Sequence, residues 1–116
     1  MRYLLLMYRD QTLFEALAPG ERELWMRACA ANDAALRASG QLLAAETLQG
    51  SETALTVRLE HGTLRLDDQQ VVLGGQRLIG LCVVDARDLN AAVQVASHMP
   101  QARAGPIEVH ALIERR

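Results

Sequence analysis

Two short runs of consecutive apolar residues constrain the fold of this 116-residue chain more than any other feature. Residues 4–7 are all apolar, and nearly every position of residues 78–84 is apolar too. Short runs without polar alternation are typical of strands that are covered on both faces. The chain therefore needs a covering layer for each face of its sheet, supplied by its own helices or by a partner.

The first third of the chain predicts a strand, a helical turn and a long helix. The strand is expected at residues 2–8. Thr12 and Glu15 have the spacing of a capping box, which predicts a brief helical turn that Pro19 and Gly20 end. A main helix over residues 21–38 ends at Ser39-Gly40. We expect its row of small residues to lie close on the sheet, with Trp25, Cys29 and Leu36 beside that row; the row consists of Leu24, Ala28, Ala31 and Ala35.

The rest of the chain predicts five more strands and a second helix. Apolar alternation on both sides of His61-Gly62 indicates a hairpin. Asp88 is expected to cap the second helix, over residues 89–98, which turns Leu89, Ala92, Val93 and Ala96 inward. The strands are expected at residues 42–48, 55–59, 64–66, 78–84 and 107–113.

The order β-α-β-hairpin-β-α-β predicts a single α+β domain over residues 1–116 with the ferredoxin-like arrangement. Both helices then lie on one face of an antiparallel sheet. The other face would leave several leucine-sized side chains in water, and burying each of them is worth about 1.5–3 kcal/mol. We therefore expect a homodimer formed sheet to sheet, in the manner of a dimeric α+β barrel.

The composition excludes several classes of function. All twelve cationic residues are arginine, so no lysine is present for a Schiff base, a pyridoxal-phosphate anchor or a GK[ST] phosphate loop. The formal charge is −2 and only four residues are aromatic, which argues against nucleic-acid binding. No apolar stretch has the length of a signal peptide core or a membrane span, and Cys29 and Cys82 form no metal or redox spacing. We expect a cytoplasmic protein without a cofactor or a membrane partner.

Several motifs fall at matching spacings along almost the whole chain. Residues 42–48 resemble a strand of the form LLxGExL, and Thr56-Val57-Arg58, Gly62 and Asp68 match a TVR motif, a hairpin glycine and the first residue of a DGPF motif. Through these residues the chain resembles the YCII-related family in its DGPF-domain branch. The resemblance implies a ferredoxin-like fold and, because such relatives are often encoded beside extracytoplasmic-function sigma factors, a link to a regulatory system. The C-terminal half adds Gly80, Asp85, Asp88-Leu89, Pro100, Gly105 and Glu108-Val109 to the matching pattern.

The chain departs from this family pattern where the pattern carries chemistry. Of the DGPF tetrapeptide only Asp68 remains, and Gly75 stands where relatives often carry a lysine. In relatives with a proposed reaction, a histidine on the first helix pairs with an aspartate after the second helix. The corresponding positions here are Cys29 and Met99. A dehydrochlorinase-like or isomerase-like mechanism that uses this pair is therefore not carried over.

The candidate site residues each have a structural alternative. Arg58 can bind a carboxylate or phosphate with Glu46 orienting it, or the two can form a cross-strand ion pair. Asp68 can hold a ligand or act as a base, or simply stand in an exposed turn. His98 is a weak candidate proton carrier, and Trp25 of the main helix completes the ligand-binding set. The three histidines, His61, His98 and His110, form no metal pattern.

Two hypotheses of function follow. The favoured one is a dimeric, non-enzymatic module that binds a small molecule or a partner as a regulatory accessory. The alternative is a small lyase-like or isomerase-like enzyme that uses acid–base residues in a cavity between the sheet and the helices.

Overall fold

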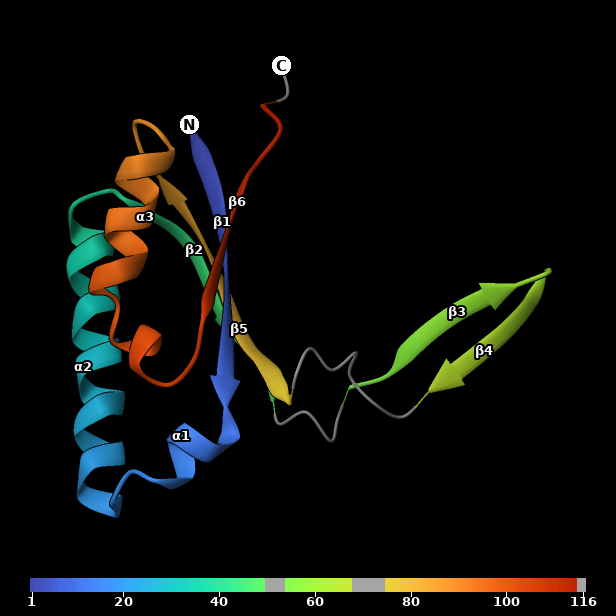
Figure 1. Cartoon of the computed structure of the whole chain (residues 1–116). Helices are drawn as coiled ribbons and strands as arrows, with labels where there is room; N and C mark the ends of the chain where they lie inside the picture. Colours follow the sequence, from blue (N-terminus) through green and yellow to red (C-terminus); the bar gives the residue numbers. More distant parts are fainter. Residues whose placement is uncertain (50–53, 68–74, 115–116) are drawn as a thin grey trace.

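The computed structural model describes residues 1–49, 54–67 and 75–114. Four strands form one antiparallel sheet in the order β2-β5-β1-β6, and β3 and β4 form a separate hairpin. Figure 1 shows α2 and α3 on one face of the four-stranded sheet. The elements are β1 (Arg2–Asp10), α1 (Gln11–Glu15), α2 (Pro19–Ala38), β2 (Leu42–Thr47), β3 (Thr56–Glu60), β4 (Thr63–Asp67), β5 (Gln76–Asp85), α3 (Leu89–His98), the 3₁₀ helix η2 (Pro100–Arg103) and β6 (Ile107–Ala111). The predicted α+β, ferredoxin-like fold is confirmed.

The central strands β1 and β5 carry apolar side chains on both faces, as their sequence predicts. On β1, Tyr3, Leu5 and Met7 are buried beneath the helices, while Leu4 and Leu6 point to the opposite face and stay partly exposed. On β5 the same alternation buries Cys82 and Val84 and leaves Leu81 and Val83 partly exposed. We call the side without helices the open face.

The start of each N-terminal helix differs from the prediction. Asp10, not Thr12, caps α1: its Oδ1 accepts hydrogen bonds from the backbone N–H groups of Thr12 and Leu13 at 2.9 and 3.2 Å. Pro19 does not end the helical turn but opens α2, because a proline at the first helical position loses no intrahelical hydrogen bond. Glu21 supports this start, since its Oε1 accepts from the Ala18 N–H at 3.2 Å.

The face of α2 that packs on the sheet is also different from the predicted row of small residues. Leu24 is 65% exposed and Ala31 and Ala35 are exposed as well, whereas Trp25 and Leu36 are partly buried. The helix is rotated so that its larger side chains face the sheet, and no residue of α2 is fully buried. An indole ring beneath a helix keeps the helix farther from the sheet than alanine would, which leaves space between the two layers.

The second helix follows the prediction more closely. Asp88 caps α3 through a 2.8 Å hydrogen bond from the Ala91 N–H to Oδ1. Ala92 and Ala96 are buried as expected, but Leu89 and Val93 are 55% and 43% exposed. The inward face of α3 is therefore built from small residues.

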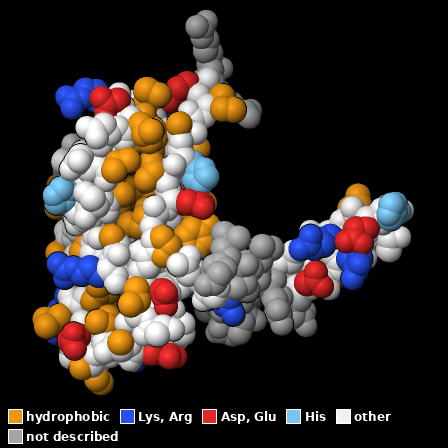
Figure 2. Space-filling model, viewed as in Figure 1, with side chains coloured by type: hydrophobic (Ala, Val, Ile, Leu, Met, Phe, Trp, Pro, Cys, Tyr) orange, Lys and Arg blue, Asp and Glu red, His pale blue; other side chains and the backbone are white. Residues whose placement is uncertain are grey.

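The β3–β4 hairpin is where the sequence predicts it, but it does not join the main sheet. His61 and Gly62 both have positive φ, as a two-residue turn with this twist requires. The hairpin extends away from the body on the side opposite the helices (Figure 1) and stands clear of it in the space-filling view (Figure 2). The radius of gyration is 16.0 Å, above the roughly 13 Å of a compact 100-residue domain.

No helix among the described residues is long and apolar enough to cross a membrane.

Candidate functional site

A cleft lies between α2 and the sheet, and it has two adjoining compartments. The outer compartment has a volume of about 570 Å³ and is bordered by Arg9, Phe14 and Arg77. The inner compartment has a volume of about 280 Å³ and is bordered by Cys29, Asp33 and Gln101. Both share Trp25, Met26, Thr47 and Ile79 in their walls. Together they have the size of a small-molecule site.

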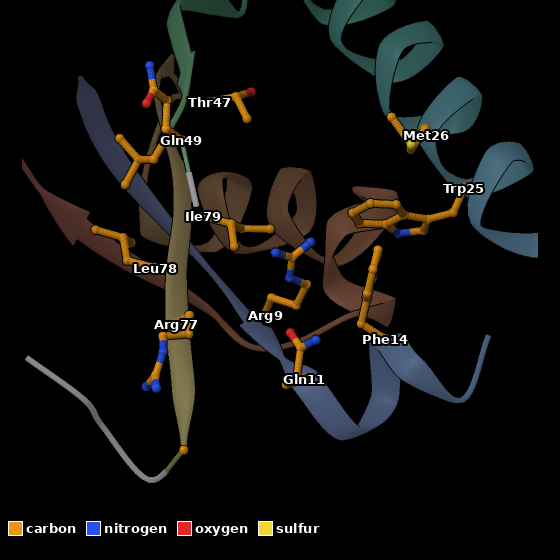
Figure 3. A pocket seen from close by; sticks show the side chains of 12 residues that line it. Arg9, Gln11, Phe14, Trp25, Met26, Thr47, Gln49, Arg77, Leu78 and Ile79 are labelled. Carbon is orange, nitrogen blue, oxygen red and sulfur yellow. The ribbon is translucent and has the colours of Figure 1, made fainter. Parts of the chain in front are cut away.

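Trp25 borders both compartments and is held in place by a hydrogen bond and an aromatic contact. Its indole N–H donates a 2.7 Å hydrogen bond to the carbonyl oxygen of Pro100, at the start of η2. Phe14 of α1 meets the indole edge-on, with ring centroids 5.9 Å apart and an interplanar angle of 74°. The ring of Trp25 is thus a fixed wall that both compartments share (Figure 3).

Two features of the sheet open the floor of the cleft. The register of β1 with β5 shifts between Met7 and Tyr8. Ile79, the β5 residue at this shift, borders the cleft. Gly80, next to it, has no side chain to fill the inner compartment; a Cβ there would lie 3.0 Å from the carbonyl oxygen of Glu46.

The outer compartment is cationic. The guanidinium of Arg9 lies 4.4 Å from the centroid of the Phe14 ring and points toward the aromatic pair, whereas Arg77 extends from β5 away from it (Figure 3). Arg9 Nε and Arg77 Nη1 are buried and have no hydrogen-bond partner in the described part of the chain. Among the described residues no acidic side chain lines this compartment or pairs with either arginine. A guanidinium in this state is suited to bind a carboxylate or another oxyanion.

The inner compartment carries one carboxyl group, that of Asp33 on α2. Burial raises the pKa of Asp33 above its ordinary value, although Arg37 and a hydrogen bond from the Gln101 side chain act in the opposite direction. Gln101 is only 9% exposed, and no residue that the structure describes donates a hydrogen bond to its buried Oε1. The compartment thus joins a carboxyl group with a raised pKa to an amide oxygen that can accept a hydrogen bond.

The two cysteines are free thiols and not nucleophiles. Burial raises the pKa of both Cys29 and Cys82 to about 11, and the nearby charge of Asp33 adds to the effect. At neutral pH both therefore remain protonated. Cys29 contributes a small, weakly polar wall to the inner compartment.

The candidate residues that the sequence suggested do not converge on one place. Trp25 lies in the cleft, as described. Arg58 stands on the exposed hairpin, where its Nε lies 3.5 Å from Asp67 Oδ2. Glu46 pairs in register with Leu81 and points to the open face, so it does not orient Arg58.

The remaining candidates lie elsewhere. His98 sits at the exposed C-terminal end of α3, where its Nδ1 lies 2.7 Å from the carbonyl oxygen of Gln94. Asp68 lies outside the described residues. His61 is in the hairpin turn, and His110 is on β6 with its Nε2 2.9 Å from Glu108 Oε1. Hence the three histidines belong to three separate elements.

Sequence reasoning did not select the residues that the cleft brings together, namely Arg9, Asp33 and Gln101. One signal was present: Trp25, Cys29 and Asp33 are four residues apart in turn and so lie on one face of a helix. Arg9 and Gln101 offered no such signal, because a strand end and a short 3₁₀ helix place them there.

The comparisons with known proteins agree with this fold. No curated protein sequence matches the chain. A solved structure of 5-chloro-2-hydroxyhydroquinone dehydrochlorinase from Burkholderia phenoliruptrix, in complex with 2,5-dihydroxybenzoquinone, is similar with a TM-score of 0.50 at 15% identity, covering 99% of this chain and 96% of that one. The model of the YCII-related domain matches residues 1–116. The chain therefore belongs to the YCII-related domain family.

Proposed function

We propose that this protein binds a small, planar, anionic organic molecule in the cleft between α2 and the sheet. One observation carries the proposal: Arg9 is partly buried beside the Phe14 and Trp25 rings, and its Nε has no hydrogen-bond partner among the described residues. A buried guanidinium without an acidic partner is costly unless a ligand completes its hydrogen bonds. The neighbouring rings provide a surface for an unsaturated ligand.

The structural neighbour supports the planar character of the ligand. That protein was solved in complex with 2,5-dihydroxybenzoquinone, a flat ring with oxygen substituents. A molecule of that shape suits a cleft with an indole wall.

The single tryptophan of the chain gives a direct test. Benzoate and its uncharged analogue benzamide are titrated while the fluorescence of Trp25 is recorded. We expect saturable quenching by benzoate and about tenfold weaker binding of benzamide. Arg9→Gln should remove the preference for the anion, whereas Arg65→Gln, on the exposed hairpin, serves as the matched control and should keep it. Equal binding of both probes by the wild type would overturn the proposal.

A second candidate function is proton-transfer catalysis, and Asp33 favours it. A carboxyl group whose pKa is raised by burial inside a cleft is suited to general acid–base chemistry. Phenylpyruvate, an anionic aromatic keto acid, is a suitable probe. The Asp33 carboxylate would take a proton from the carbon beside the carbonyl while the electron pair moves to the carbonyl oxygen, giving the enolate and protonated Asp33. Asp33 would then return this proton to the enolate oxygen, which gives the enol and restores the carboxylate. Enol absorbance should appear faster with the wild type than with Asp33→Asn; equal rates would exclude this role.

We also propose that the protein is a homodimer. The open face exposes part of Leu4, Leu6, Leu81 and Val83, and the hairpin presents a second apolar surface. In the hairpin, cross-strand register puts Val57 opposite Leu66 and Leu59 opposite Leu64 on one side; each of these is 55–74% exposed. A two-fold dimer can cover both surfaces of each copy with the other.

The size of these surfaces fits a dimer better than a lone chain. Burying a leucine-sized side chain is worth about 1.5–3 kcal/mol. Covering four such side chains on the hairpin and four on the open face would therefore strongly favour association of two chains. Light scattering after size exclusion at micromolar concentration should give twice 12.7 kDa, and Leu59→Asp should shift the protein toward the single-chain mass. A 12.7 kDa wild-type species would contradict the proposal.

The sigma-factor link remains a proposal that rests on the family resemblance alone.

A further inference from the structure

The amide of Gln101 is the polar group of the cleft that the binding of an anion by Arg9 does not explain. Its side chain is more than nine-tenths buried in the wall of the inner compartment, and its Oε1 accepts no hydrogen bond from any described residue. Buried amide oxygens in native proteins are nearly always paired. This oxygen is therefore the place where a bound molecule has most to gain.

The backbone at Gln101 is fixed from two sides. Trp25 ties the preceding residue to α2 through its 2.7 Å hydrogen bond to the Pro100 carbonyl. The Ala104 N–H donates a 3.1 Å hydrogen bond to the Gln101 carbonyl and closes the 3₁₀ turn. The Asp33 carboxyl group borders the same compartment as the amide. Because the backbone on both sides of Gln101 is tied down, the amide stays in the wall of this compartment.

The walls of the inner compartment offer this oxygen little. Met7, Met26, Ala30 and Ile79 are apolar, and the Cys29 thiol is at most a weak donor. The hydroxyl of Thr47 also borders the compartment, but neither it nor any other described group donates to Gln101 Oε1. The side that remains open leads past Trp25 into the outer compartment, since the indole borders both.

From these placements we infer that the inner compartment recognises a hydroxyl group of the ligand, whose O–H donates to Gln101 Oε1 beside the Asp33 carboxyl group. This inference rests on the proposed function and specifies its ligand class: a planar molecule with an oxyanion at the Arg9 end and a hydroxyl at the Asp33–Gln101 end. A site built to pair with a hydroxyl discriminates against the analogue that lacks it, because its own polar groups are then left unpaired.

The test compares ligands that differ only in the hydroxyl. Benzoate, 3-hydroxybenzoate and 4-hydroxybenzoate are titrated against the full-length protein with Trp25 fluorescence as the readout. We expect at least one hydroxybenzoate to bind about tenfold or more tightly than benzoate. Gln101→Met keeps a side chain of similar length without the acceptor, so this variant should bind benzoate and the hydroxybenzoates with equal affinity.

The outcomes separate the two proposals. If benzoate binds and neither hydroxyl derivative binds more tightly, the role of Gln101 is refuted while the anion site stands. If none of the three probes binds, the proposed function itself fails. Thermal unfolding of Gln101→Met shows whether this variant is folded; if it is not, the wild-type comparison of the three probes still decides the question. A preference that survives in folded Gln101→Met would also overturn the inference.

Discussion

Gly105→Ala should destabilise the protein severely, because the backbone of β1 leaves no room for a side chain at this position. A Cβ on Gly105 would lie 2.1 Å from the Tyr8 carbonyl oxygen and 3.0 Å from the Asp10 nitrogen. The atoms in the way are backbone and cannot rotate aside. The segment before β6 must therefore move away from the end of β1, on which Arg9 stands.

The magnitude follows from what that movement breaks. Two backbone hydrogen bonds flank Gly105, from the Tyr8 N–H to the Pro106 carbonyl at 3.0 Å and from the Asp10 N–H to the Ala104 carbonyl at 2.8 Å. Overpacking costs about 1–3 kcal/mol and each lost hydrogen bond about 0.5–1.5 kcal/mol net. The unfolding free energy should fall by roughly 2–6 kcal/mol, a large part of the about 5–15 kcal/mol of a typical domain.

Urea unfolding followed by circular dichroism measures this loss, and thermal unfolding should show a melting temperature lower by at least about 8 °C. Gly20→Ala is the matched control. No atom lies within 4 Å of a Cβ there and Gly20 is in the first turn of α2, so this substitution should leave stability unchanged or raise it by up to about 1 kcal/mol. A Gly105→Ala protein that is as stable as the wild type would refute the reasoning.

Three further predictions concern the cleft and its surroundings. The pKa of the Cys29 and Cys82 thiols is about 11 in the folded protein against an ordinary 9.0, so the unfolded chain loses these protons first. The unfolding free energy should therefore fall as pH rises from 9 to 11, and denaturation titrations should show a smaller fall for Cys82→Ala; no difference in slope would contradict the assignment. The raised pKa of Asp33 means that the folded state binds its proton more tightly, so stability should decrease as pH rises above the ordinary 3.8 through the raised value. Asp33→Asn should flatten this part of the stability profile, and an unchanged profile would count against burial as the cause. Trp25→Phe removes the indole N–H that Pro100 accepts and should cost about 1–3 kcal/mol in urea unfolding, whereas a loss below 0.5 kcal/mol would show that the hydrogen bond contributes little.

The sequence predicts the elements of this fold well, because their signals are local. The apolar runs of β1 and β5, the His61-Gly62 turn and the Asp88 cap each specify a backbone conformation from neighbouring residues alone. The errors occur where local signals compete. Asp10 and Thr12 are both able to cap α1, and only the path of β1 decides in favour of Asp10.

The rotation of α2 could not be predicted from its pattern. A row of small residues and a row with Trp25 and Leu36 both suit a sheet, and the choice depends on what η2 offers to the indole N–H. This long-range contact joins residues 75 positions apart, and it creates the cleft that the small-residue packing would have closed.

The candidate site could not be predicted from the sequence, because long-range contacts also decide which residues it brings together. Arg58 and Glu46 stand at plausible spacings, yet the hairpin separates from the sheet and Glu46 points to the open face. Arg9 and Gln101 come from the end of β1 and from η2, which the backbone hydrogen bonds on either side of Gly105 bring together.

The indole N–H of Trp25 provides the most direct test that this cleft is a binding site for planar anions. Because the chain has one tryptophan, a ¹H–¹⁵N correlation spectrum contains a single indole signal. During titration with benzoate we predict that this signal shifts and saturates in the wild type, and that it does so only at much higher concentration in Arg9→Gln. An indole signal that stays unmoved by saturating benzoate would contradict the account.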